Sequence, residues 1–262
     1  MTSPGKARGR NGVTSRLHGS PFLREIAEWH STKRSGHEES RDSLAERNAA
    51  AVDLLSTGST ARALTTLHEI AATCTTVLGA DDVDTLVARG NVAVLHAVLE
   101  QWDEALPLLT TNLAARDRVL GDEHPATLAA RDALAAAHRL GGEPAEAAAL
   151  SARVAAQRTR VLGPTHRDTL TSRLGHGLAC FELGDVPAAT EYLAAALHDA
   201  ERALGAADPM TAVLREQLAR CQAEAGHREE AAATRRVPEP RTTSRGWAAI
   251  SSTGYGAPAP GY

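Results

Sequence analysis

The sequence predicts an all-α, right-handed solenoid of stacked helical hairpins, and two observations carry this prediction. The ten-residue phrase VLGDEHPATL at 119–128 returns 42 residues later as VLGPTHRDTL at 161–170. Alanine and leucine are abundant, aromatic residues make up only 3% of the chain, and the β-branched or aromatic runs that suit strands are missing. An internal repeat of this length in a helix-favouring sequence indicates a stack of two-helix units.

Glycine and proline residues in each unit indicate where its two helices begin and end. A Leu-Gly pair recurs at a constant interval, as Leu78-Gly79, Leu120-Gly121, Leu162-Gly163 and Leu204-Gly205. In the third unit Pro125 suits the first turn of a helix, and the Gly141-Gly142 pair breaks the chain before Pro144 opens a second helix. That helix is expected to stop at Gly163, since glycine readily adopts the left-handed conformation that ends helices. The repeated phrase is therefore the joint between one hairpin and the next.

Two positions of each unit hold only small residues. They are Ala51, Ala93, Ala135, Gly177 and Ala219 in the first helices, and Ala63, Ala105, Ala147, Ala189 and Ala231 in the second helices. Small residues are required where two helices cross closely, because a longer side chain would overpack the contact at a cost of about 1 to 3 kcal/mol. These two ladders predict the packing interface of the hairpins.

This pattern, together with turn glycines, resembles the tetratricopeptide repeat. The turn glycines are Gly58, Gly142, Gly184 and Gly226. The phrase LGDEHPATL, with NVAVLH at 91–96 and EALPLL at 104–109, is similar to the longer variant that is typical of kinesin light chains and common in actinobacterial proteins. The resemblance covers roughly residues 38–233. It implies about four full repeats followed by a C-terminal capping helix.

The sequence departs from the family pattern at a few positions. His96, His138, Cys180 and Gln222 stand where the family usually has tyrosine, so a looser core is expected. Pro107 lies inside a second helix, where proline removes one backbone hydrogen bond, but proline is familiar at this point in the longer variant and should be tolerated.

The two terminal segments, 1–37 and 234–262, have the composition of disordered chain and flank the solenoid expected over 38–233. Within the first of them, residues 21–30 carry Phe22, Ile26 and Trp29 at the spacing of one apolar helix face. This short amphipathic helix can act as a lid on the first repeat. It can also serve as a docking peptide, either for a partner or for the groove of this protein itself.

The formal net charge of −4 is unevenly distributed. Residues 1–37 hold seven lysines and arginines against two glutamates, and residues 234–262 hold four arginines against one glutamate, which leaves −12 on residues 38–233. An acidic body is a poor match for nucleic acid and a better one for basic peptides. We therefore expect a protein or peptide partner, with a basic segment, and not a nucleic acid.

No segment reaches the apolar length of a membrane helix, so a membrane partner is not expected. Three cysteines, Cys74, Cys180 and Cys221, are odd in number and lack metal-ligand spacing, which favours a reducing, cytoplasmic location. The chain contains no phosphate-binding loop, no H-E-x-x-H and no G-x-S-x-G motif. We expect a protein that is not an enzyme and that uses no cofactor and no metal.

Two further repeated positions can be assigned structural roles. His124 and His166 recur in the joint, where Asp82 and Asp208 fill the same place, so capping of helix starts is expected in preference to metal binding. An arginine occurs at one offset in all five units, as Arg47, Arg89, Arg131, Arg173 and Arg215. These arginines can form a stripe for phosphate or carboxylate ligands. We favour a structural role, in which they tie neighbouring units through carboxylates such as Asp117 or Glu201.

The concave groove is the expected working surface, because hairpins stacked at a constant offset curve into a superhelix lined by their first helices. The resemblance assigns to this groove Asn91, Val94, Asp132, Arg139, Leu178, Phe181 and Glu216, with Val213 and Arg220 at further lining positions. It also implies that Asn91 holds a peptide backbone. Val94, Leu178 and Phe181 would supply apolar contacts, and Asp132 and Glu216 would attract basic segments.

Two functions fit this groove. The first is a non-catalytic scaffold or adaptor that binds an extended peptide or a helix. The second is a regulatory or sensor module whose groove is autoinhibited by its own basic tails, or by the 21–30 helix, until a ligand displaces them.

Overall fold

The computed structural model describes residues 38–237, and the predictions for 1–37, including the 21–30 helix, and for 238–262 lie outside this part. Within it the chain forms α-helices joined by short turns, with no strand. The helices are α3 (Glu38–Ser56), α4 (Thr60–Val77), α5 (Val83–Val98), α6 (Trp102–Leu120), α7 (Pro125–Leu140), α8 (Pro144–Leu162), α9 (Arg167–Glu182), α10 (Val186–Leu204), α11 (Pro209–Glu224) and α12 (Arg228–Arg235). The all-α prediction is confirmed.

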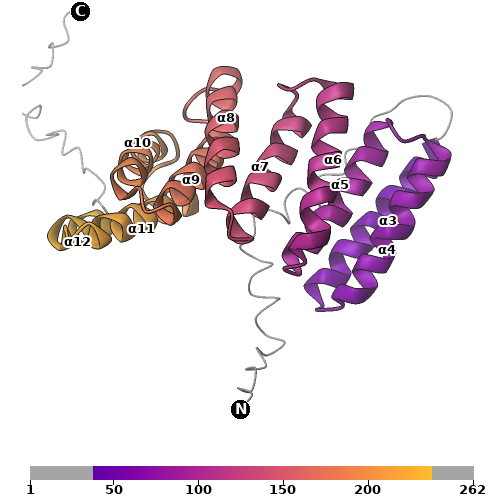
Figure 1. The fold of residues 1–262 in the computed structure, drawn as a ribbon, viewed down its shortest axis with the longest axis horizontal. Coiled ribbons are helices and arrows are strands. Elements are labelled where there is room, and N and C mark those ends of the chain that lie inside the picture. Colours follow the sequence, from indigo (N-terminus) through magenta and orange to yellow (C-terminus); the bar gives the residue numbers. More distant parts are fainter. Residues whose placement is uncertain (1–37, 238–262) are drawn as a thin grey trace, which may run out of the picture.

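Consecutive helices pack as hairpins that follow one another along the long axis of the molecule, from α3 and α4 to α11 and α12 (Figure 1). The first helices of neighbouring hairpins also contact each other, α5 with α7, α7 with α9 and α9 with α11, whereas consecutive second helices pack less closely. In a curved stack the row with the closer neighbours is the inner one. The predicted α-solenoid of four full hairpins is confirmed, and where a capping helix was predicted the stack ends in a shorter pair, α11 and α12. The first helices form the concave side.

The joints between hairpins have the predicted geometry. Helix α7 begins at Pro125, α8 begins at Pro144, and α8 ends at Gly163, whose φ is +89°. A residue with a Cβ would be strained in this left-handed region. Pro107 is tolerated, since α6 continues through it to Leu120. At the C-terminal end, α12 extends to Arg235, two residues past the predicted boundary of the solenoid.

The small residues of both ladders are buried, as expected for helix crossings. The crossing is close at Gly177, where a Cβ would lie only 2.7 Å from the Cγ atom of Leu193 on α10. Alanine fits at the equivalent positions of the other hairpins, so α9 and α10 approach each other more closely than a methyl group allows.

The interior is divided into two apolar cores and a polar region between them. The N-terminal core extends from α3 to α7 and contains Ile70 and Leu95, whereas the C-terminal core contains Leu170 and Leu193. Between them, buried polar side chains of α7, α8 and α9 form what we call the polar junction, which consists of Arg131, Gln157, Arg158 and Ser172. A fully buried leucine contributes about 1.5 to 3 kcal/mol through removal of apolar surface from water. The polar junction must instead be stabilised by hydrogen bonds and ion pairs.

Candidate functional site

The repeated histidines of the joints cap helix starts, as predicted. The Nδ1 atom of His124 accepts a hydrogen bond from the backbone N–H of Ala126 at 3.2 Å, and His166 does the same for Asp168 at 3.2 Å. Asp82 and Asp208 cap α5 and α11 through their carboxylates. In the described residues, no group of three or more histidine, cysteine, aspartate or glutamate side chains is arranged to hold a metal ion.

Two members of the arginine ladder tie neighbouring hairpins through the predicted carboxylates. The fully buried Arg131 of α7 donates to Asp117 of α6 at 2.7 Å, and Arg215 of α11 donates to Glu201 of α10 at 2.8 Å. Two other members form ion pairs inside their own hairpins, Arg47 with Glu69 at 3.3 Å and Arg173 with Asp199 at 2.6 Å. The guanidinium groups of these four arginines therefore serve the stack itself.

A second pair of buried arginines was not anticipated from the sequence. Arg116 of α6 donates to the carbonyl oxygen of Ala126 at 2.7 Å, and Arg158 of α8 donates to that of Asp168 at 2.9 Å. Each arginine thus binds the first turn of the next hairpin and ties two hairpins together. The available signal was their 42-residue spacing.

In the N-terminal half of the concave row, the predicted lining residues are buried. Asn91 of α5 is 1% exposed, and its Nδ2 atom donates to the Oδ1 atom of Asn48 at 2.8 Å. Val94 has no exposed surface. In this structure neither side chain is accessible to a partner. The predicted lining residues that remain candidates for partner contact lie on later hairpins.

In the middle of the row, the predicted charged residues are paired within the chain. The carboxylate of Asp132 forms an ion pair with Arg158 and accepts a hydrogen bond from Ser172 at 2.9 Å. Arg139 of α7 donates to Glu182 of α9 at 2.7 Å. These contacts join α7, α8 and α9, so both residues hold hairpins together across this part of the face.

The C-terminal half of the row presents the accessible part of the predicted site. Leu178 and Phe181 of α9 are partly exposed, and the guanidinium carbon of Arg220 on α11 lies 4.7 Å from the centre of the Phe181 ring. This cation–π contact was not predicted, although both residues were assigned to the lining. Val213, also on α11, is 45% exposed. Leu178, Phe181 and Val213 form what we call the C-terminal apolar face, and Arg220 lies beside it.

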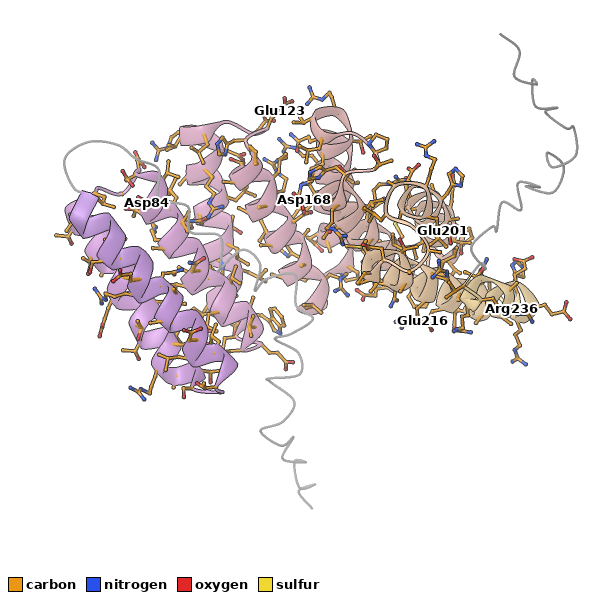
Figure 2. The ribbon with its side chains drawn as sticks, turned by 180° about the vertical axis from the view of Figure 1, so that it is seen from behind. Asp84, Glu123, Asp168, Glu201, Glu216 and Arg236 are labelled. Atoms are coloured by element: carbon orange, nitrogen blue, oxygen red, sulfur yellow. The ribbon has the colours of Figure 1, made fainter. Side chains whose placement is uncertain are left out.

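Glu216 lies on α11 toward the C-terminal end of the stack, near Arg236 and far from Asp84 (Figure 2). Its carboxylate forms an ion pair with Arg235 of α12 at 3.1 Å, and this neighbour lowers the pKa of Glu216 below its ordinary value. The pair fastens the last helix to α11. Because the charge of Glu216 is partly neutralised in this way, its attraction for a basic partner is weaker than the sequence suggested.

A cysteine and a histidine lie close together in the C-terminal core. The Sγ atom of Cys180 is 3.8 Å from the Nε2 atom of His176, whose ring packs edge-to-face against Tyr192. Burial raises the pKa of the Cys180 thiol and lowers that of the His176 imidazole. A nucleophilic cysteine requires a lowered thiol pKa. These shifts keep both groups neutral at pH 7, which does not fit an activated thiolate.

No helix in the described part of the chain combines the length and the apolar character needed to cross a lipid bilayer.

Comparisons with known proteins agree with the repeat geometry. The tetratricopeptide-repeat family model matches residues 84–156. A search of curated protein sequences found no match. Among solved structures, nearly identical TPR-like repeats from a Podosopora anserina kinesin light chain superpose with a TM-score of 0.67 at 26% identity, covering 73% of this chain and 91% of that chain. A point variant of those repeats superposes with a TM-score of 0.68 at 25% identity, covering 77% and 93%.

BtubC (BKLC) from P. vanneervenii has the same fold, with a TM-score of 0.67 at 14% identity over 98% of this chain and 100% of that chain. The 42-residue hairpins and the small residues at each crossing agree with these likenesses. The described part of the chain therefore has the fold of a tetratricopeptide-repeat solenoid, and it is similar to repeats of the kinesin light chain type.

Proposed function

We propose that this protein is a non-catalytic, cytoplasmic scaffold or adaptor that binds a peptide or a helix of another protein on its concave face. The tetratricopeptide-repeat fold serves generally as a protein-interaction scaffold. The observation that supports a specific site is the C-terminal apolar face, where Leu178, Phe181 and Val213 leave apolar surface exposed on the inner row of helices.

The partner contact is proposed to be mainly apolar. Asp132 and Glu216 are already paired with Arg158 and Arg235, so they add less attraction for a basic segment than unpaired carboxylates would. The charge of −12 on residues 38–233 still favours the approach of a basic partner over an acidic one. An apolar anchor in a basic peptide matches both properties.

Two valines of equal exposure provide a matched test of this face. Val213 lies on the inner helix α11 and Val161 on the outer helix α8, and each is 45% exposed. Partners captured from a lysate of the source organism by the full-length protein would be quantified by mass spectrometry. We expect Val213→Asp to reduce the captured partner at least tenfold and Val161→Asp to leave it unchanged. Equal capture by both variants would reject the site.

A second candidate is the regulatory module, and the opposite charges of the tails and the body favour it. Residues 1–37 have a net charge of +5 and residues 38–233 of −12, so the tail is electrostatically attracted to the solenoid. Deletion of residues 1–37 should then raise the affinity for the captured partner. Unchanged affinity would count against autoinhibition by this segment and leave the scaffold proposal intact.

A further inference from the structure

Two histidines face each other across the junction between the first and second hairpins. The Nε2 atom of His68 on α4 lies 3.4 Å from the Nε2 atom of His96 on α5, with the two rings at 72° to each other. The other ring nitrogen of His96, Nδ1, is 2.7 Å from the Oε1 atom of Gln101. An amide oxygen only accepts hydrogen bonds, so Nδ1 of His96 carries the proton and Nε2 of the neutral ring presents a lone pair.

The distance between the two Nε2 atoms is close to that of a ligand pair on a tetrahedral cation, whereas the rings point almost directly at each other and must turn to converge on one. Two imidazole nitrogens bound at 2.0–2.1 Å to one tetrahedral metal lie about 3.3 Å apart. Metal-ligating histidines commonly donate their second N–H to an oxygen that fixes the tautomer, and Gln101 supplies that oxygen to His96. We propose that His68 and His96 form a two-histidine site for a divalent cation that favours imidazole, such as Zn²⁺, which staples α4 to α5.

The site requires only a small rearrangement. In the metal-free pair the Nε2–H of His68 donates to Nε2 of His96; with the metal bound, His68 carries its proton on Nδ1 and both Nε2 atoms face the cation. The side chain of His68 is exposed and can turn to do this, whereas His96 is held by Gln101.

Among the described hairpins, this pairing occurs at the first junction. The position of His68 is taken by Thr110, Ala152 and Ala194 in the later units, and the equivalent of His96 in the third unit, His138, contacts Glu143 instead. Two protein ligands leave the remaining coordination positions to water. The α3–α4 hairpin packs against the rest of the stack through the contact of α4 with α5. A cation bound between these two helices would strengthen that contact.

The test uses tag-free, full-length protein, because a histidine tag would itself bind the metal. Zn²⁺ is titrated by calorimetry, and the melting temperature is measured with and without Zn²⁺. His68→Ala removes one ligand from an exposed position, and His198→Ala removes an exposed histidine of α10 as the matched control. We expect His68→Ala to weaken the tightest Zn²⁺ binding at least tenfold and to abolish the Zn²⁺-induced rise in melting temperature, with His198→Ala matching the wild type.

Imidazole ¹H–¹⁵N correlation spectra identify the ligands directly, since histidines elsewhere can bind Zn²⁺ without involving this pair. The proposal predicts that the resonances of His68 and His96 shift together at the lowest Zn²⁺ concentrations, and that Mg²⁺, which prefers oxygen ligands, shifts neither. Zn²⁺ binding of wild-type strength in His68→Ala, or early shifts confined to other histidines, would overturn it.

Discussion

The N-terminal core and the polar junction hold neighbouring hairpins together by different means. In the N-terminal core, helices α4 to α6 meet through fully buried aliphatic side chains such as Ile70 and Leu95. In the polar junction, the largest fully buried side chain is Arg131, which donates to Asp117 and Gln157, both at 2.7 Å. One repeat geometry therefore accommodates either kind of interior, provided that the small residues at the helix crossings are kept.

The two kinds of interior differ in how uniquely they fix the arrangement of the helices, as well as in how they stabilise the fold. Apolar contacts are non-directional and tolerate changes of shape, whereas a buried guanidinium is satisfied only when its partners have one arrangement. We infer that the polar junction fixes the relative orientation of α7, α8 and α9. Helix α9 is the first helix of the accessible part of the concave face.

The largest expected effect is at Arg131. Arg131→Ala leaves a cavity and removes the donor to the Oε1 atom of buried Gln157 and to the carboxylate of Asp117, so we expect a loss of about 3 to 5 kcal/mol in the free energy of unfolding. Leu95→Ala, its counterpart in the N-terminal core, should cost about 2 to 5 kcal/mol through the cavity alone. Urea denaturation monitored by circular dichroism measures both. A loss below about 1 kcal/mol for Arg131→Ala would mean that the polar junction contributes little.

The next effect is at the crossing of α9 and α10 in the C-terminal half. Gly177→Ala places a Cβ 2.7 Å from Leu193 Cγ and should destabilise the protein by about 1 to 3 kcal/mol. Gly175 lies on the same helix and has no atom within 4 Å of a built Cβ, so Gly175→Ala should stabilise by about 0.5 to 1 kcal/mol. Thermal denaturation of the two variants should show shifts of opposite sign. Shifts of the same sign would contradict the close approach at Gly177.

A smaller effect is expected at the turns between paired helices, where the second hairpin differs from the other hairpins of the described chain. In the C-terminal half these turns contain Gly184 and Gly226 with φ of +82° and +86°, whereas the turn before α6 places Glu100 at a φ of +59°. Glu100→Gly should relieve this strain and raise the free energy of unfolding by up to about 1 kcal/mol. Gly184→Ala should lower it. A destabilised Glu100→Gly variant would show that the glutamate side chain outweighs the strain of its backbone.

The smallest effect concerns a threonine repeated at the start of the inner helices α5, α7, α9 and α11. In the part of the chain that the structure describes, the buried Oγ1 atoms of Thr85 and Thr127 have no hydrogen-bond partner. Thr85→Val and Thr127→Val should therefore be neutral or stabilise by up to about 1 kcal/mol, since a valine of similar shape removes an unsatisfied hydroxyl. Ser151→Ala is the control, because the Ser151 hydroxyl donates to Ala147 at 2.6 Å and its loss should destabilise. Destabilisation in both threonine variants would indicate a bonded hydroxyl.

Features that depend on one repeat and its neighbour could be predicted from the sequence. The joints at Pro125 and Gly163, the caps at His124 and His166 and the Arg131–Asp117 pair follow from residue type and a constant offset. Each of these is a local contact or is repeated along the chain.

The accessibility of the candidate groove could not be predicted in the same way. The burial of Asn91 and Val94, the Asp132–Arg158 ion pair and the contact of Arg220 with Phe181 depend on side-chain rotamers and on how far each hairpin is rotated against the next. The position of a residue in the repeat predicts which face of the helix it lies on. It does not predict whether the long side chain of a neighbouring arginine will contact it. For this reason, several residues that were expected to bind a partner are buried or form contacts within the chain instead.

The most direct test of the proposed function is site-specific photo-crosslinking of the full-length protein to its captured partner. A photoreactive residue placed at position 213 on the inner helix α11 should attach to the partner, and one placed at position 161 on the outer helix α8, where the valine is equally exposed, should not. Attachment from position 161 with none from position 213 would contradict binding on the concave face.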